Sequence, residues 1–273
     1  MNAPDMIQPG SAAAGDRAPR FDQHGRCLPR ADTQAACHSR TRRYFLPAQP
    51  KMDYAAIHRR IAGQLDGAAP DAAEFERLAR GVLAGLEADP ATRNLLNGVH
   101  VPFFLPQASH DDIGEALESR YLPALERVYV EALPEYGFVN HHKAGLSGML
   151  TPADGSRHRD LIAAMARGPV VGVYFPCLLE YSLPAALEQM ADLPGHFLLA
   201  GGYDTAAAFI GSPDLLLRKD GYPPLMWLSG LDSEKEGVGY HFEAYGYDLT
   251  FNRRVHQGMA AEYWASGLVV LAQ

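Results

Sequence analysis

The stretch from residue 168 to residue 212 limits the possible folds of this chain more than any other part of its sequence. Residues 170–175 form a nearly continuous apolar run, which is typical of a strand covered on both faces. Ser182 then begins a helix as its N-cap, and residues 196–200 form a second apolar strand. Because the connection between the strands contains a helix, we expect them to run parallel with a right-handed crossover. The stretch therefore predicts a central βαβ unit.

Small and polar residues follow the carboxyl ends of these two strands. Parallel strands place their carboxyl ends at one edge of a sheet, and open α/β folds bind ligands at that edge. By this fold-level analogy we expect a small-molecule site there. Its candidate residues are Cys177, Glu180, Gly201, Gly202, Tyr203 and Asp204.

Four of these side chains are candidate catalytic residues. Cys177 is a possible nucleophile, Glu180 or Asp204 a general acid or base, and Tyr203 a hydrogen-bond donor. No histidine of the unit follows the same edge to lower the pKa of the Cys177 thiol. A buried apolar role for this cysteine is therefore the alternative, since free cysteines are among the most buried residues.

The Gly201-Gly202 pair is a candidate ligand-binding element, because backbone amides at a helix N-terminus hold anions. Asp204 is also placed to cap the following helix, and its charge would repel an anion. A tight turn is the alternative interpretation of the two glycines.

Residues 240–251 alternate between apolar and polar side chains, which predicts antiparallel strands in the C-terminal part of the sheet. The alternation changes phase at Gly246, which indicates a bulge or a sharp bend. His241 and Glu243 lie on one face of such a strand. They are candidate ligand-binding residues, with a solvated cross-strand polar pair as the alternative.

Two segments resemble metal sites in composition, and neither predicts one. Residues 232–243 carry acids and a glycine at positions like those of a calcium-binding loop, but strands rather than helices flank them. His24, Cys27, Cys37 and His38 are zinc-ligand types, but their spacing does not match known zinc sites. The sequence predicts no metal and no particular cofactor.

The N-terminal half reads as mainly helical. Residues 52–134 show helical periodicity, with Asp71 and Glu74 as a capping box, and the proline-bracketed residues 101–106 are confined to an edge strand or loop. The expected class is α/β, with α+β as the alternative. We expect a helical segment at 52–150 and a sheet segment at 151–273, which together can form one compact domain.

Residues 1–51 differ in composition from the rest of the chain. Up to residue 50 they are rich in proline and arginine and contain no glutamate or lysine. We expect a disordered or loosely attached tail. Two alternatives are an export leader and a true start at Met52.

Charge and composition restrict the function. The net charge of −8 argues against a general nucleic-acid binder, and no apolar run is long enough to span a membrane. Three scattered cysteines and no secretory signal favour the cytoplasm. The sequence favours an enzyme acting on a small polar metabolite, although it carries no known catalytic motif. The alternatives are a non-catalytic binding or assembly module, whose protein partner would contact the 52–134 helices, and an exported factor. The oligomeric state stays open.

Overall fold

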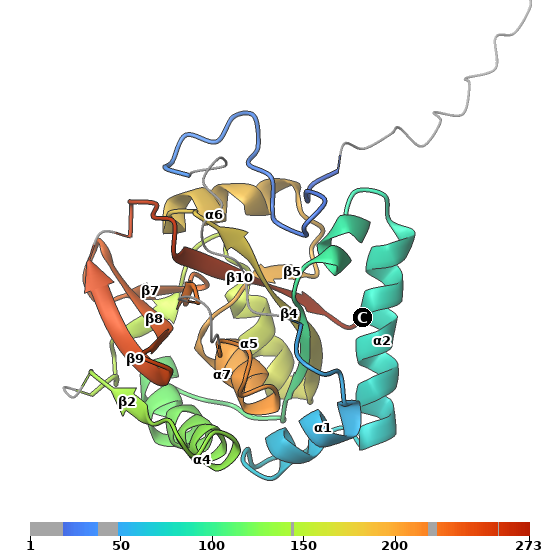
Figure 1. Ribbon diagram of the computed structural model, residues 1–273, viewed down its shortest axis with the longest axis vertical. Helices are drawn as coiled ribbons and strands as arrows, with labels where there is room; N and C mark the ends of the chain where they lie inside the picture. Colours follow the sequence, from blue (N-terminus) through green and yellow to red (C-terminus); the bar gives the residue numbers. More distant parts are fainter. Residues whose placement is uncertain (1–18, 38–48, 143–144, 218–222, 256) are drawn as a thin grey trace, which may run out of the picture.

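A mixed eight-stranded sheet forms the centre of the part of the chain that the structure describes (Figure 1). The computed structural model describes residues 19–37, 49–142, 145–217, 223–255 and 257–273. The strand order is β1-β4-β10-β6-β8-β9-β2, and β5 pairs with the second half of β10. The bounds are β1 Val101–Leu105, β2 Phe138–Asn140, β4 Val170–Leu179, β5 Phe197–Leu199, β6 Leu225–Trp227, β8 Val238–Tyr245, β9 Asp248–Val255 and β10 Trp264–Leu271. A separate pair joins β3 Leu150–Pro152 to β7 Leu231–Ser233.

Helices cover both faces of the sheet, and the predicted α/β class is confirmed. One face carries α7, α1 and α4, and α6 packs on the other, while α2 contributes Phe75 and Ala79 to the first core and Val82 and Leu86 to the second. Alternate residues of β10 divide between the two cores, because Val269 belongs to the first and Leu268 and Val270 to the second. The bounds are α1 Tyr54–Ala62, α2 Ala72–Ala88, η1 Arg93–Asn97, α3 Ile113–Ala116, η2 Leu117–Tyr121, α4 Leu122–Ala132, α5 His158–Arg167, α6 Leu183–Gln189, η3 Met190–Asp192 and α7 Gly202–Gly211.

The two strands of the central unit, β4 and β5, run parallel to each other, as predicted. Both β4 and β5 run antiparallel to β10, so they run parallel to each other. They are not neighbours, however, because β10 lies between them and pairs with each. The C-terminal strand thus completes the unit that the sequence predicts from residues 168–212.

The strand expected at residues 170–175 is longer than predicted and continues as β4 to Leu179. Pro176 does not end it, because the pairing with β10 shifts register there: Phe175 faces Leu268 and Leu178 faces Ser266. A bulge accepts a proline, since the residue needs no ladder hydrogen bond from its nitrogen. Cys177 therefore lies within the strand and not beyond its end.

The phase change at Gly246 is a hairpin turn. Tyr245 pairs with Asp248, and the two residues between them, Gly246 and Tyr247, have φ angles of 61° and 73°. Positive φ at both central positions matches the tight turns that follow the twist of antiparallel strands. The sharp bend predicted here is thus the β8–β9 connection.

The segment expected to be a loose tail includes residues that pack against the sheet. We call residues 19–37 the N-terminal strap. Phe21 is fully buried in the same core as Cys177, and the backbone nitrogen of Cys27 donates to the carbonyl oxygen of Cys177 at 3.0 Å. Apolar burial at Phe21 and strand-like pairing hold the strap, and neither is visible in its composition. Residues 1–18 and 38–48 lie outside the described residues.

Strands from the expected helical segment join the same sheet as the C-terminal strands. β1 pairs with β4 at one edge of the sheet, as its prolines predict, and β2 pairs with β9 at the other. Within the described ranges, no helix is both long and apolar enough to cross a membrane.

Candidate functional site

The residues predicted at the carboxyl edge of β4 and β5 do not converge in one place. Cys177 lies in the β4 bulge and is 2% exposed. Its burial raises the pKa of the thiol well above the ordinary value. The thiolate is the nucleophilic form of cysteine, so this environment disfavours the role predicted for Cys177.

Asp204 acts as a helix cap. Its two carboxylate oxygens accept from the backbone nitrogen of Gly201 at 2.9 and 3.1 Å, at the start of α7. The side chain is fully buried, and this burial raises its pKa to about 7. The cap occupies the Gly201 amide that was predicted to hold an anion.

The two glycines allow close packing. A Cβ atom added to Gly201 would lie 2.3 Å from the imidazole of His158, and one added to Gly202 would lie 2.9 Å from Leu117. No other residue fits against these neighbours without displacing them. The Gly201-Gly202 turn is therefore filled by the protein's own side chains.

Tyr203 follows this turn in α7, whereas Glu180 lies at the end of β4. The Tyr203 ring stacks on Tyr121 with 4.5 Å between ring centroids, and its hydroxyl donates to the Ile113 carbonyl oxygen at 3.3 Å. Glu180 directly follows β4 with a φ angle of 64° and is 3% exposed. Its backbone nitrogen donates to the carbonyl oxygen of Trp264 at 2.8 Å. Glu180 thus borders a second group of residues that includes His241 and Glu243.

This second group lies on the face of the sheet formed by β10, β6, β8 and β9. The strand register places Ser266 beside Trp227 and Trp227 beside His241 in one row. Trp264 lies on the same face of β10, two residues from Ser266. Glu243 and Arg254 follow on the same face of β8 and β9. We call Trp227, Trp264, Ser266, His241, Glu243 and Arg254 the Trp–His cluster.

Aromatic contacts build the inner part of the cluster. The Trp227 ring meets the Trp264 ring edge-to-face at a centroid distance of 5.3 Å and the His241 ring at 5.2 Å. Gly239 makes room for this packing, because a Cβ there would lie 2.8 Å from the Trp227 ring and 3.3 Å from Leu183. Leu183, the first residue of α6, thus lies against Trp227.

Polar atoms of the inner cluster are buried without hydrogen-bond partners among the residues that the structure describes. They are both indole nitrogens, the Ser266 hydroxyl and the imidazole nitrogens of His241, of which Nε2 has the Glu243 carboxylate 3.8 Å away, beyond hydrogen-bond distance. A buried polar group without a partner costs about 1–3 kcal/mol. Several such groups in one row are unusual in a native core and call for an explanation beyond packing.

The outer part of the cluster is charged. A Glu243 carboxylate oxygen lies 3.8 Å from His241 Nε2 and 3.5 Å from an Arg254 guanidinium nitrogen, and Arg254 also donates to the Tyr263 hydroxyl at 3.3 Å. His241, followed by Arg254, holds the pKa of Glu243 below its ordinary value. Burial lowers the pKa of His241, and Glu243 partly opposes that shift.

This arrangement pairs a neutral imidazole with an ionised carboxylate, the combination used for proton transfer in many enzymes. Sequence reasoning found His241 and Glu243 but missed Trp227, Trp264, Ser266 and Arg254. Trp227 and Trp264 are the only two tryptophans of the chain, which was an available signal. The register that aligns them with His241 depends on strands far apart in sequence.

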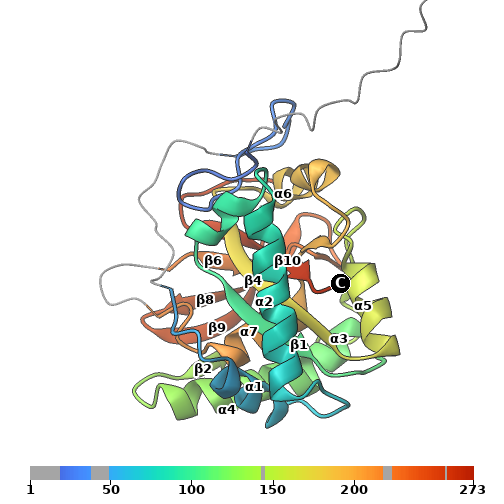
Figure 2. The same cartoon turned by 90° about the vertical axis from the view of Figure 1, so that its right-hand side faces the viewer.

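A cleft beside α2 is a separate feature. One cavity of about 330 Å³ is bounded by Gly81 and Gly85 of α2, by residues 194–197 and by the end of β10. A second, of about 390 Å³, adjoins it and shares Asp89, Thr92 and Pro194. Figure 2 shows α2 on the outside of the molecule, with the C-terminus of the chain beside it.

Comparison with known proteins gave no relative for this chain: no family model matches it, and no similar protein was found among curated sequences or solved structures. In the described part of the chain, no group of three or more His, Cys, Asp or Glu side chains is placed to hold a metal ion.

Proposed function

We propose that the protein is an enzyme that binds a small polar metabolite at the Trp–His cluster, where His241 transfers a proton and Glu243 stabilises the charged imidazole. The observation that carries this proposal is the row of buried polar atoms across β10, β6 and β8 that have no hydrogen-bond partner in the described part of the chain. A ligand that satisfied these atoms would recover the free energy that their burial costs.

The chemistry of the cluster indicates the class of ligand. Indole N–H groups, the Arg254 guanidinium and the Ser266 hydroxyl all donate hydrogen bonds. Among the six residues of the cluster only Glu243 brings a formal negative charge, and it is already engaged with Arg254, while Glu180 borders the cluster. A ligand rich in acceptors, such as a carboxylate or a phosphate ester, suits this set of donors.

The site is closed in this structure. His241 and Trp227 are fully buried, whereas the side chains of Glu243 and Arg254 are 21% and 35% exposed. A ligand therefore reaches the inner polar atoms only when neighbouring groups move, and the Glu243–Arg254 pair marks the side that faces solvent.

Intrinsic fluorescence tests this proposal, because both tryptophans of the chain belong to the cluster. We expect saturable fluorescence changes on titration with one or more of succinate, citrate, inorganic phosphate and glycerol phosphate. Removing the imidazole with His241→Gln should weaken that binding at least about tenfold, a loss on the scale of one charge-assisted hydrogen bond.

His196→Gln, which alters a histidine at the α2 cleft, is the matched control and should bind like the wild type. Circular dichroism checks that both variants fold. The proposal fails if none of these compounds changes the fluorescence, or if His241→Gln binds as tightly as the wild-type protein.

A specific observation favours a second candidate function, assembly through α2. Arg77, Gly81, Gly85 and Asp89 follow at four-residue intervals along one line of this helix, and a Cβ added to either glycine meets nothing within 4 Å. Glycine in a helix interior costs about 1 kcal/mol relative to alanine, and the fold here gives no reason for it.

A second copy of the chain would fit this line. If two α2 helices crossed antiparallel at residue 83, Arg77 of each copy would face Asp89 of the other, with the glycines in close contact between them. Light scattering should then show a dimer that Arg77→Asp dissociates and that the double variant Arg77→Asp/Asp89→Arg restores. A monomeric wild-type protein at all accessible concentrations would contradict assembly through α2.

A further inference from the structure

We propose that the N-terminal strap is a latch that keeps the Trp–His cluster closed, so that its release admits the ligand. This inference rests on the function proposed above and adds its control. The strap contacts Tyr181 and Ser182 outside the cluster, and the next residue, Leu183, packs against Trp227 inside it.

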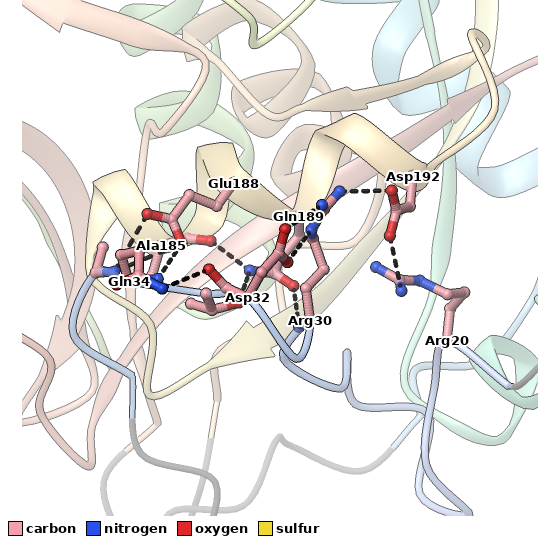
Figure 3. A network of polar contacts seen from close by, with 10 residues as sticks. Arg20, Arg30, Asp32, Gln34, Ala185, Glu188, Gln189 and Asp192 are labelled. Carbon is pink, nitrogen blue, oxygen red and sulfur yellow. Dashed lines mark hydrogen bonds and ion pairs between the residues drawn. The ribbon is translucent and has the colours of Figure 1, made fainter.

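Acidic and amide side chains of α6 and η3 fasten the strap (Figure 3). The Glu188 carboxylate accepts from the backbone nitrogens of Gln34 at 2.8 Å and Ala35 at 3.2 Å. The Gln189 side chain accepts from the backbone nitrogen of Arg30 at 2.9 Å and donates to the Thr33 hydroxyl at 3.1 Å. These four bonds hold the second half of the strap to one helix.

Ion pairs complete the fastening. Asp192 binds Arg30 at 2.5 Å and Arg20 at 3.2 Å, and its side chain is 45% exposed. Exposed ion pairs weaken as salt screens them. Besides the Arg20–Asp192 pair, the first half of the strap has an apolar anchor, because Phe21 is fully buried and Cys27 is 5% exposed. The strap thus has an apolar anchor in its first half and ion pairs that salt can screen in both halves.

The C-terminal end of the strap contacts residues 181 and 182, which directly precede Leu183, the residue that packs on Trp227. Cys37 forms a β-bridge with Tyr181, and the Ala36 carbonyl oxygen accepts from the backbone nitrogen of Ser182 at 2.9 Å. Ser182 is the N-cap of α6, and the next residue, Leu183, packs against Trp227. The strap therefore holds the backbone that positions Leu183.

Release of residues 30–37 would remove these constraints on Tyr181 and Ser182, while the Leu183 backbone nitrogen keeps its bond to the Gln257 carbonyl oxygen at 2.9 Å. Leu183 could then move away from Trp227, which would give the indole and imidazole nitrogens access to solvent or ligand. The buried polar atoms of the cluster, which form no hydrogen bond to any described residue, favour this opening, since water or a ligand satisfies them. The strap contacts of Glu188, Gln189 and Asp192 oppose this opening. The difference between the two free energies sets the fraction of molecules in which the site is open.

Acrylamide quenching of tryptophan fluorescence tests the latch without any ligand. In the full chain, Glu188→Ala/Asp192→Ala should raise the quenching constant at least about threefold, because local opening exposes both indoles. Glu76→Ala/Asp154→Ala is the matched control, since it removes two carboxylates from exposed ion pairs with Arg80 and Arg159. This control should quench like the wild type.

Salt gives a second measurement on the unaltered protein, which also serves if the double variant does not fold. Raising NaCl from about 0.02 M to about 0.5 M shortens the screening length to a few ångströms and should increase quenching in the wild type. The latch is overturned if neither Glu188→Ala/Asp192→Ala nor high salt changes the quenching constant. It is also overturned if the control Glu76→Ala/Asp154→Ala raises the quenching constant as much as the latch variant does.

The two proposals fail in different ways. Increased quenching together with no binding of any carboxylate or phosphate retains the latch and rejects the ligand site. Ligand binding that depends on His241, with quenching unaffected by loss of the strap contacts, rejects the latch and retains the site.

Discussion

Asp204 and His158 are buried side chains whose ionisation the fold opposes. Burial raises the pKa of Asp204 from 3.8 to about 7 and lowers that of His158 from 6.5 to about 4. Both lie at the Gly201 turn, Asp204 as its cap and His158 as its packing partner. At the residue scale, this turn is held by two neutral side chains near pH 6.

The two groups give stability opposite dependences on pH. The stabilising contribution of protonated Asp204 is complete below about pH 4 and is lost as the pH rises through about 7. The contribution of neutral His158 is complete above about pH 6.5 and is lost as the pH falls through about 4. Between pH 4 and 6.5 the two slopes oppose each other, so the contributions of Asp204 and His158 to the pH dependence of stability nearly cancel there.

We predict that Asp204→Asn reveals the contribution of His158 to the pH dependence of the free energy of unfolding. The amide oxygen still accepts from Gly201, so the cap remains while the titration disappears. Between pH 4 and 6.5 the free energy of unfolding of this variant should rise by roughly 3 kcal/mol more than that of the wild type, as one shifted unit corresponds to about 1.4 kcal/mol.

Urea unfolding at a series of pH values measures this change, and His158→Gln is the complementary variant. Relative to the wild type, its free energy of unfolding should fall between pH 4 and 7, because the titration of Asp204 is no longer opposed by that of His158. Identical pH profiles for Asp204→Asn and the wild type would show that Asp204 does not titrate in this range.

At the scale of elements, strand ends and connections were the features that sequence patterns predicted least well. Pro176 was expected to end a strand, but a bulge opposite β10 accommodates it. Cys177 consequently lies inside β4, away from the edge where a nucleophile was expected. A bulge depends on the partner strand, which lies some ninety residues further along the chain.

Capping and alternation were better guides. Asp71 caps α2 by accepting from the backbone nitrogen of Glu74 at 2.8 Å, and Ser182 caps α6 by accepting from that of Ala185 at 3.2 Å. Both N-caps were predicted, but the Glu74 side chain expected to complete a capping box binds Arg77 instead. Alternation along residues 240–251 placed His241 and Glu243 on one face, where the structure has them 3.8 Å apart. These features depend on residues within one or two turns of each other, which a sequence shows directly.

At the scale of the whole molecule, β10 connects the parts of the fold. It pairs with β4 on one side and with β6 and β5 on the other. It also contributes side chains to both cores and two residues to the Trp–His cluster. The last strand of the chain is therefore central in space.

We predict that a chain ending at Ser266 does not fold. The deletion removes Leu268, Val269 and Val270, each at most 1% exposed, and the pairing of β4 with β5 through them. Burial of three such side chains contributes about 6 kcal/mol, comparable to the total stability of a typical domain.

Circular dichroism and thermal unfolding of the truncated protein check this outcome. A truncated chain with a cooperative thermal transition would contradict the central role of β10. Deletion of residue 273 alone, which lies beyond β10, is the control and should leave the transition in place.

The sequence by itself determined the α/β class, the caps of α2 and α6, the parallel direction of β4 and β5, and the shared face of His241 and Glu243. Each of these follows from periodicity, apolar runs or capping within a short stretch of chain. Only the tertiary structure decided that β10 lies between β4 and β5, that the strap packs on α6, and that Trp227, Trp264 and Ser266 join His241. Strand order and register arise from contacts between distant segments, whose free energy depends on the whole core and not on any local pattern.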